Sequence, residues 1–380
     1  MVYIVDYSFT VFGKINGIWA DHRASDLASL VIKDITSRFN YPVDLVILGN
    51  VIGAGCGQNL ARQALFKAGL NINTPAFVVN QVCISPIKAI HTAFVNILSG
   101  EYDVVIAGGV ESMTNAPFLA RVRMGNKYGD MSLEDSINTD GLRCGISNKL
   151  MIEIAEQIAK KYQITREEQD KLAYESHKRA LNFWNLLSKK INFIKSTKKE
   201  IDENIREDIS IDKLSSLRVV LKGESSSITA GNASSLADGA AAVLLVSEKA
   251  LKKYNLKPLA QIRGFAESFD LPENFPIVPS ISTNSLLKKL NISKQEIDLW
   301  EINEAFACVL AANMKILEID YERTNIFGGA VAFGHPIGAT GARLVINSIL
   351  ALKHTNFSKA VITVCAGTGG GYSLLLENIS

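Results

Sequence analysis

The chain has 380 residues, of which 47% are hydrophobic and 21% are charged, a composition that is ordinary for a globular protein. This length allows two or three domains with a large hydrophobic core. The formal net charge of +2 argues against a dedicated nucleic-acid-binding protein, although a local basic cluster could still hold a phosphorylated ligand.

Apolar strands and amphipathic helices alternate over the first third of the chain. Apolar residues recur at helical spacing over 24–38, which predicts a helix. Residues 44–49 form a continuous apolar run that ends in glycine, which is typical of a strand buried on both faces in a parallel sheet. The elements expected next are helix 59–69, strand 76–80, helix 86–99 and strand 103–109. This order predicts an open, mostly parallel α/β sheet.

A cysteine stands between the predicted strand 76–80 and the helix 86–99. Cys83 is our candidate nucleophile, because a thiol just before a helix lies near the positive end of the helix dipole. That position favours the thiolate and predicts a pKa below the ordinary value of about 8.5. A small buried core cysteine is the alternative for this residue taken alone.

The alternating pattern stops between residues 121 and 234. This region is polar and charged, with helices expected at 149–162 and 166–186 and a lysine-rich stretch at 189–222. We interpret it as an inserted loop domain that lies over the sheet. The apolar strand 241–246 then returns to the core, and another strand is expected near 260–264.

The last third of the chain resembles the first. Residues 298–303 correspond to 44–49, and residues 359–364 correspond to 102–107, which indicates duplicated halves. If the halves pack around a pseudo-two-fold axis, loops that follow their strands meet at one active site between them. The expected domains are a first half at 1–120 plus 235–265, the inserted loop domain at 121–234, and a second half at 266–380.

Three later segments have the composition of reactive loops. Residues 301–307 place Asn303 where a buried strand turns into a helix, residues 328–341 surround His335 with glycines, and residues 364–371 do the same for Cys365. Each segment alone also allows a structural interpretation, since asparagine at a helix start is often only a cap.

Taken together, these segments resemble one family, the thiolases, from about Ile4 to the C-terminus. The motifs that carry the resemblance occur in family order: Asn-x-x-Cys-x-Ser at 80–85, Gly-Gly-Val-Glu-Ser-Met at 108–113, Thr-Ala-Gly-Asn-Ala-Ser at 229–234, Asp-Gly-Ala-Ala at 238–241, Asn-Glu-Ala-Phe-Ala at 303–307, Gly-His-Pro-Ile-Gly at 334–338 and Cys-x-Gly at 365–367. The resemblance implies two duplicated βαβαβαββ halves that form a layered α/β/α/β/α core.

The resemblance also implies Claisen chemistry on coenzyme A thioesters. The residue matching Cys83 would attack an acyl thioester and become acylated, and the residue matching Cys365 would move a proton at the α-carbon. His335 and a water held by Asn303 would stabilise an enolate oxygen. The backbone N–H groups of Cys83 and Gly367 would stabilise the tetrahedral intermediate.

The inserted region would then bind coenzyme A. Arg206 matches a family arginine near the nucleotide, and Ala230 and Ser234 match positions that line the pantetheine channel. Coenzyme A thioesters are expected as substrates rather than as a bound cofactor. No metal site is expected, since the five cysteines (56, 83, 144, 308 and 365) are scattered without Cys-x-x-Cys or histidine at ligand spacing.

Several residues depart from the family pattern. Pro86 stands where glycine is usual, which leaves open whether the helix begins at Pro86 or the turn before it is strained. Leu150 replaces a histidine, 275–279 replaces a Met-Gly-x-Gly-Pro loop, and 8–11 lacks the customary Arg-Thr-Pro. The shape of the acyl pocket is expected to differ accordingly.

The resemblance favours a short-chain, acetoacetyl-forming thiolase that joins two acetyl-CoA through an acetylated Cys83. A degradative 3-ketoacyl-CoA thiolase of broader chain length is the second hypothesis. A ketosynthase is disfavoured, because ketosynthases of this fold use a cysteine with two histidines, whereas here Asn303 takes the place of the second histidine and Cys365 is present. A non-catalytic, thiolase-like protein that binds acyl-CoA is a further alternative.

The remaining expectations concern location and assembly. The first residues lack a basic region before an apolar run, and no uncharged apolar run reaches the ~20 residues of a membrane-spanning helix. We therefore expect a cytoplasmic protein with no membrane or nucleic-acid partner. The resemblance alone implies a homodimer or a homotetramer.

Overall fold

The computed structural model describes residues 1–125, 127–223 and 226–379. The strands in these residues are β1 (Val2–Phe9), β2 (Gly13–Lys14), β3 (Leu45–Gly49), β4 (Ala76–Val79), β5 (Val104–Ser112), β6 (Phe118–Leu119), β7 (Glu134–Asp135), β8 (Ala237–Ser247), β9 (Ala260–Phe269), β10 (Leu299–Ile302), β11 (Lys359–Ala366) and β12 (Gly370–Glu377). The helices are α1 (Ala24–Arg38), α2 (Leu60–Ala68), α3 (Ser85–Leu98), α4 (Met151–Lys161), α5 (Arg166–Leu187), α6 (Ile211–Ser215), α7 (Glu248–Lys253), α8 (Val278–Leu290), α9 (Ala307–Leu317), α10 (Ala330–Phe333) and α11 (Thr340–Thr355).

The predicted alternation of strands and helices in the first third is confirmed. Helix 24–38 has the predicted bounds, and the strands predicted at 44–49 and 76–80 each differ by one residue at one end. Pro86 is the second residue of α3 rather than its first, because Ser85 already takes the helical conformation. Cys83 therefore lies two residues before the helix.

The strands form two similar sets. In the first set the order is β4-β3-β5-β8-β1, and in the second it is β10-β11-β12-β9. β3 pairs in parallel with β4 and with β5, and the second of these pairings matches that of β10 with β11, whereas the remaining neighbours are antiparallel in both sets. The prediction of a mostly parallel sheet is therefore wrong. A short pairing of β1 with β9 joins the sets into one sheet. The predicted duplication is thus confirmed in strand order and direction.

One aspartate in each half sets the register of the duplication. The Asp44 carboxylate accepts hydrogen bonds from the N–H groups of Asp103 and Val104, and the Asp298 carboxylate accepts them from Ser358 and Lys359. These contacts confirm the correspondence of 44–49 with 298–303. They make Lys359 the equivalent of Val104 rather than of Tyr102. The correspondence predicted between 359–364 and 102–107 is therefore wrong by two residues.

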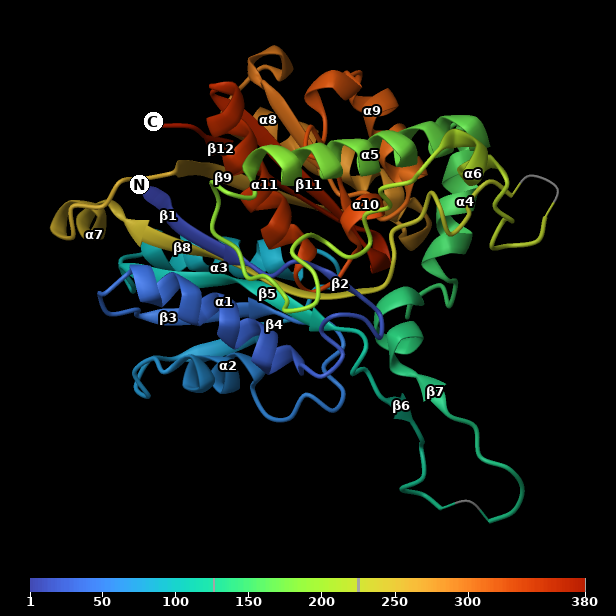
Figure 1. The fold of residues 1–380 in the computed structure, drawn as a ribbon, viewed down its shortest axis with the longest axis horizontal. Helices are drawn as coiled ribbons and strands as arrows, with labels where there is room; N and C mark the ends of the chain where they lie inside the picture. The colour runs from blue at the N-terminus through green and yellow to red at the C-terminus, as the bar shows by residue number, and fades with distance from the viewer. Residues whose placement is uncertain (126, 224–225, 380) are drawn as a thin grey trace.

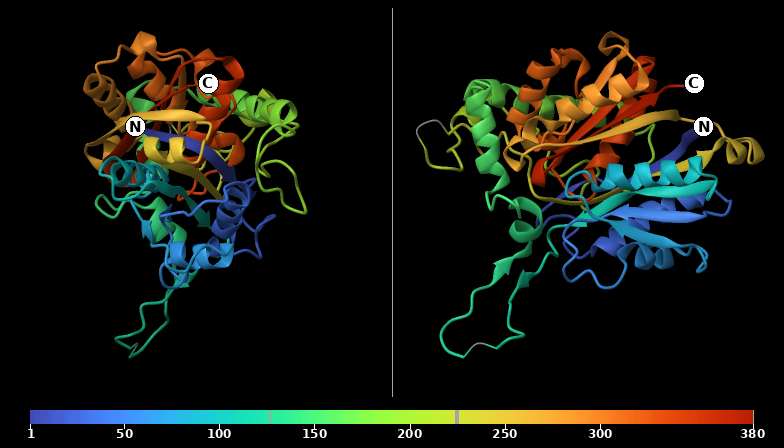
Figure 2. Two further views of the ribbon diagram at one scale, coloured as in Figure 1. Left: turned by 90° about the vertical axis from the view of Figure 1, so that its left-hand side faces the viewer. Right: turned by 180° about the vertical axis from the view of Figure 1, so that it is seen from behind.

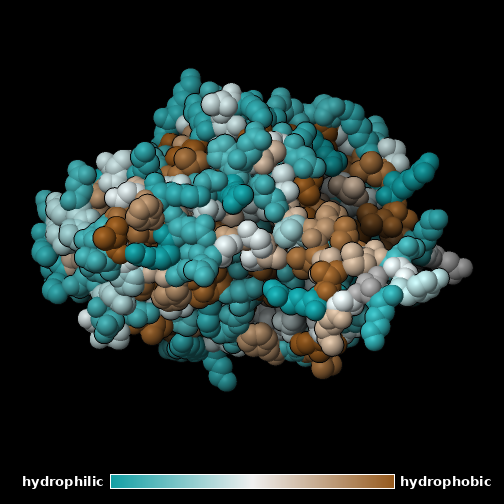
Figure 3. All heavy atoms as spheres, turned by 90° about the horizontal axis from the view of Figure 1, so that it is seen from below, coloured by the Kyte–Doolittle hydropathy of each residue, from teal (hydrophilic) through white to brown (hydrophobic). Residues whose placement is uncertain are grey.

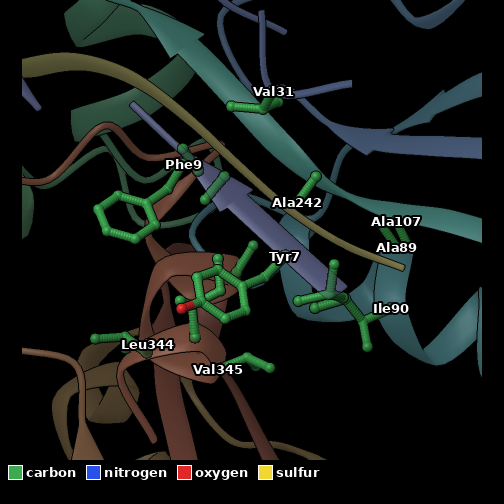
Figure 4. Close-up of a cluster of buried hydrophobic side chains, with 14 of the residues drawn as sticks. Tyr7, Phe9, Val31, Ala89, Ile90, Ala107, Ala242, Leu344 and Val345 are labelled. Carbon is green, nitrogen blue, oxygen red and sulfur yellow. The ribbon is translucent and has the colours of Figure 1, made fainter. Parts of the chain in front are cut away.

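Two helices lie between the two sets of strands (Figure 1, Figure 2). α3 packs on β3 and β5 of its own half, and Lys88 on it is ion-paired with Glu267 on β9 of the other half. α11 packs on β10 and β11 and also contacts β8. Every residue of α11 from Thr340 to Leu352 is buried, which is characteristic of a helix enclosed on all sides. Figure 4 shows side chains of both helices meeting those of the strands in one core.

The outer layers and the insertion complete the predicted arrangement. α1 covers β5 and β8 of the first half, and α8 covers β9 and β12 of the second. The inserted helices α4 and α5 pack on α9, so they lie against the second half of the molecule. The domain boundary expected after residue 265 falls inside β9, which pairs with β12 along its length. None of the helices in the described chain combines the length and hydrophobicity that crossing a bilayer requires.

A buried ion pair ties the middle helix α11 to the insertion. Arg343 donates to Asp202 over 2.9 Å, and each side chain is 1% exposed. The Asp202 carboxylate also accepts from the indole of Trp184 and from the N–H of Phe12. The guanidinium of Arg343 lies 4.0 Å from the ring centre of Phe9, so its charge is further stabilised by the π face.

We predict that Asp202→Asn lowers the free energy of unfolding by about 3–5 kcal/mol, because it leaves the buried charge of Arg343 without a counter-ion. Glu248→Gln, which disrupts the exposed ion pair with Lys252, is the control and should leave the free energy of unfolding almost unchanged. Urea unfolding followed by circular dichroism measures both. Equal effects of the two substitutions would contradict the assignment.

Candidate active site

A cavity of about 230 Å³ lies where the loops of the two halves meet. Cys83, His335, Cys365 and Gly367, all predicted from the sequence, line it together. Most of its remaining wall is apolar, and it includes Met113, Leu142, Leu150, Met151, Ile152, Leu236, Phe275, Phe306 and Ile337. Two thiols, an imidazole and backbone N–H groups from distant parts of the chain thus face one largely apolar cavity.

The turn that presents Cys83 has an unusual backbone. Val82 has a φ of 51°, a conformation that costs a β-branched residue on the order of 1–3 kcal/mol. Hydrogen bonds within the turn hold it in place. The Val82 N–H donates to the Asn80 side chain over 3.1 Å, and the Ser85 hydroxyl accepts from the Gln81 N–H and donates to the Val82 carbonyl. The strain fits a loop that must aim one side chain.

The predicted lowering of the Cys83 pKa is wrong for the ligand-free protein. Burial is the largest effect and raises the pKa of Cys83 to about 12, although the N–H of Gly367 lowers it in part. The sulfur is enclosed by the apolar cavity wall, even though part of the residue's surface remains open to the cavity. The resting residue is therefore a neutral thiol, and a base must take its proton before it can attack.

His335 is held in a defined tautomer. Its Nδ1 lies 2.7 Å from the hydroxyl oxygen of Thr340, and that hydroxyl donates to the carbonyl of Pro336 over 2.9 Å. The hydroxyl has a single proton, so it accepts from Nδ1–H, and Nε2 keeps its lone pair. Nε2 is buried and has no hydrogen-bond partner within the described part of the chain. Burial lowers the pKa of His335 to about 4, so the imidazole is neutral near pH 7.

Cys365 ends strand β11 on the opposite side of the cavity. Burial raises the pKa of this thiol well above its ordinary value, and the nearby Cys83 raises it further. Cys83 can raise the pKa of Cys365 because the two thiols lie near each other on the same cavity. Thr368, just beyond Gly367, has a φ of 70°. This turn directs the Gly367 N–H towards the Cys83 sulfur.

Asn303 follows strand β10, as predicted, but it does not line the cavity itself. Its side chain is buried, and neither its amide oxygen nor its amide nitrogen has a partner among the described residues. Its own backbone N–H donates to Thr363 on β11 over 3.0 Å, which fixes its position beside the Cys365 strand. A buried amide with both ends free is suited to hold a water molecule.

The three residues predicted to bind coenzyme A separate into two places. Ser234 lines the cavity, and its hydroxyl donates to the carbonyl of Ala305 over 2.8 Å. Arg206 and Ala230 are exposed and do not line the cavity. They are joined to each other by a hydrogen bond of 3.2 Å from the guanidinium to the carbonyl.

Sequence reasoning missed two kinds of residue. Thr340, which sets the His335 tautomer, lies in the glycine-rich segment 328–341. Its spacing of five residues from His335 is the feature of the sequence that could have indicated the contact. The apolar wall was only partly expected: Leu150 and Phe275 stood out as departures from the family pattern, whereas Met151 and Phe306 did not. Pro86 left open a strained turn before the helix, but nothing in the sequence indicated that Val82 carries the strain.

Two family models cover nearly all of the chain. The model described as the N-terminal domain of thiolase matches residues 2–249, and the model described as the C-terminal domain of thiolase matches residues 256–378. The chain therefore belongs to the thiolase family, as its motifs predicted. Its duplicated halves and the layer of helices between them are the thiolase fold.

Several relatives match over the whole chain. It is similar to the mitochondrial acetyl-CoA acetyltransferase of Rattus norvegicus, with 40% identity over all of this chain and 91% of the relative. It is 38% identical to the acetyl-CoA acetyltransferase of Saccharomyces cerevisiae, over 99% of that protein. The crystal structure of the Bacillus anthracis acetyl-CoA acetyltransferase matches with a TM-score of 0.96 and 34% identity, over 98% of that chain.

We predict that Thr340→Val slows alkylation of Cys83 by iodoacetamide roughly 10- to 100-fold at pH 7.5, because the imidazole loses the acceptor that fixes its basic Nε2 towards the cavity. Thr355→Val removes a hydroxyl that donates to the Ala351 carbonyl at the end of α11, and serves as the control. Peptide mass spectrometry over time measures the rate. An unchanged rate in Thr340→Val would show that the tautomer is not set by this contact.

Proposed function

We propose that this thiolase catalyses the reversible condensation of two acetyl-CoA to acetoacetyl-CoA and free coenzyme A, through an acetylated Cys83. The observation that carries the proposal is the meeting of Cys83, His335, Cys365 and Gly367 on one apolar cavity. Relatives about 40% identical over the whole chain are acetyl-CoA acetyltransferases, which supports the choice of acetyl-CoA.

In the first half-reaction, Cys83 attacks the thioester carbonyl. The Nε2 of His335 takes the Cys83 proton, and the thiolate forms a bond to the carbonyl carbon. The bond from that carbon to the coenzyme A sulfur then breaks, and the leaving thiolate receives the Cys365 proton. The raised pKa of Cys365 supports its starting as a thiol that can donate. Free coenzyme A departs, and Cys83 is acetylated.

In the second half-reaction, the Cys365 thiolate removes a proton from the methyl group of a second acetyl-CoA. The resulting carbanion attacks the acetyl group on Cys83, a carbon–carbon bond forms, and the Cys83 thiolate leaves. Cys365 ends as a thiol, and the Cys83 thiolate takes back its proton from Nε2 of His335, so all three groups return to their starting state. A thiolate is attacker and leaving group in both directions, which makes the reaction reversible.

Negative charge develops on oxygen twice, and the site offers donors for both events. The tautomer of His335 has no proton on Nε2 until it accepts one from Cys83. From then on Nε2–H can donate to the enolate oxygen, together with a water held by Asn303. The N–H groups of Cys83 and Gly367 would stabilise the tetrahedral intermediate, and each such donor is typically worth about 10²–10³ in rate.

Coenzyme A would approach over the insertion. We propose that its pantetheine arm passes Ser234, which lines the cavity, and that Arg206 and Ala230 lie outside near the nucleotide. The exposed guanidinium supports pairing with an anionic phosphate. Coenzyme A enters as part of each substrate, and the proposed steps use side chains and backbone of this chain together with the water held by Asn303.

The chain's assembly and location are also proposals. We propose a homodimer or a homotetramer, supported by the described residues between β6 and β7, which extend away from the body (Figure 1, Figure 2). The described residues of this segment include Met124 and Tyr128, which are 99% and 98% exposed, and such exposed apolar groups favour a protein partner. Hydrophobic side chains also gather over the right-hand half of the face seen in Figure 3.

A cytoplasmic location is supported by the cysteines and by one relative. All five cysteines are free thiols, which suits a reducing compartment. The chain is 38% identical to an acetyl-CoA acetyltransferase of Gibberella zeae that is named as cytosolic.

For the domains, we propose a boundary before β9, near residue 255, in place of the one expected after residue 265, because β9 pairs along its length with β12.

Intact-protein mass spectrometry after mixing with acetyl-CoA tests the proposed function. The wild type should gain one acetyl group within the first turnover, and Cys83→Ala should gain none. Cys365→Ser should still become acetylated but lose condensation by at least about 10²-fold, since the methyl proton no longer has a base. Acetylation of Cys83→Ala at the wild-type rate would rule out Cys83 as the nucleophile.

A degradative thiolase of broader chain length is the second candidate, favoured by the apolar wall that Leu150 and Phe275 add to the cavity. The small volume of the cavity, about 230 Å³, favours short acyl groups instead. We predict that kcat/KM for thiolysis falls as the 3-ketoacyl chain grows beyond four carbons, because longer chains must displace the apolar wall. Thiolysis rates that rise with chain length would reverse the choice.

A further inference from the structure

One carboxylate of the second half reaches both sides of the Cys83 turn. Glu267 lies on β9, and one of its oxygens accepts a hydrogen bond from the Gln81 side-chain amide. Its other oxygen is 2.9 Å from the Nζ of Lys88. Gln81 stands two residues before Cys83, and Lys88 is in the first turn of α3, five residues after it. The strained turn is therefore bracketed by two contacts to one side chain.

The same carboxylate is fixed relative to the opposite wall of the cavity. Glu267 pairs with Tyr372 in the ladder between β9 and β12, and Cys365 pairs with Gly371, next to Tyr372, in the ladder between β11 and β12. Lys88 also lies 5.5 Å from the ring centre of Tyr372. Glu267 is thus held, through β12, in a fixed position relative to Cys365 on β11 and to Gly367 just after it.

We propose that Glu267 is a positioning residue, which sets the distance between the Cys83 turn of the first half and the Gly367 turn of the second. The inference rests on the proposed role of Cys83 as the nucleophile. Its physical reason is that the N–H groups of Cys83 and Gly367 come from different halves and must converge on one oxygen. A displacement of about 1 Å between such groups can cost on the order of 10²-fold in rate.

The internal hydrogen bonds of the turn do not provide this alignment. Those that the Asn80 and Ser85 side chains accept fix the backbone within the first half, and they would move with it. Glu267 adds a contact between the halves. Its carboxylate is about one-quarter exposed and Lys88 about one-third, so replacing either group leaves the buried core intact.

Single-turnover acetylation of Cys83 by acetyl-CoA tests the proposal in Glu267→Gln. The amide keeps the size of the side chain but loses its charge and one of its two acceptors. We expect acetylation about 10- to 100-fold slower, with KM within about twofold of the wild type and an unchanged melting temperature.

Glu377→Gln is the matched control, because Glu377 is ion-paired with Arg263 at the far end of the same β9–β12 ladder. It should acetylate at the wild-type rate. Wild-type acetylation in Glu267→Gln, an equal loss in Glu377→Gln, or a rise in KM that accounts for the whole loss would overturn the proposal. Should Glu267→Gln fail to fold, Gln81→Leu, which leaves the Lys88 pair, decides it: a wild-type rate there counts against the proposal.

Alkylation of Cys83 by iodoacetamide separates this inference from the proposed function. Alkylation needs no acyl transfer, but it depends on where the sulfur lies relative to the Gly367 N–H. If the wild type were not acetylated at all, the proposed function would fail. Slower alkylation in Glu267→Gln than in Glu377→Gln would still support the positioning role, and equal rates would refute it.

Discussion

The enclosure of α3 and α11 between the two sets of strands is the constraint on which the site depends. Both helices are preceded by reactive loops, and both are fixed by apolar contacts on opposite faces. Neither helix can shift without opening the core that surrounds it. Cys83 and His335 are therefore held where the two halves meet, and the strands β10 and β11 bring Asn303 and Cys365 to the same place.

This enclosure also decides the protonation of the site. Burial in an apolar cavity disfavours every charge, so it raises the pKa of both thiols and lowers that of His335. The resting site is neutral, and it has no thiolate exposed to oxidants or to unintended electrophiles. In the proposed mechanism, charge forms only when a proton moves from Cys83 to His335. The thiolate and the imidazolium then stabilise each other in the low dielectric of the cavity.

The sequence predicted the fold and the polar residues of the site because both depend on local patterns. Apolar runs of period two or 3.6 report burial, and motifs around Cys83, His335 and Cys365 report chemistry. It could not predict the Cys83 pKa, because the local pattern showed only the helix dipole, whereas the cavity wall comes from remote residues such as Leu150 and Phe275. The register of the second half and the boundary at β9 likewise depend on pairing partners far along the chain.

The two halves repeat the backbone but not the chemistry. With Asp44 aligned to Asp298, Gly49 of the first half stands where Asn303 stands in the second, and the β-ladders align Val110 with Cys365. Apolar or glycine positions in one half are thus matched by reactive ones in the other. Because a condensation needs an electrophile held by one group and a carbanion generated by another, two unlike halves around one cavity suit it better than two identical ones. The repeated backbone brings the loops of both halves to one cavity. The different side chains at equivalent positions allow one half to hold the electrophile and the other to generate the carbanion.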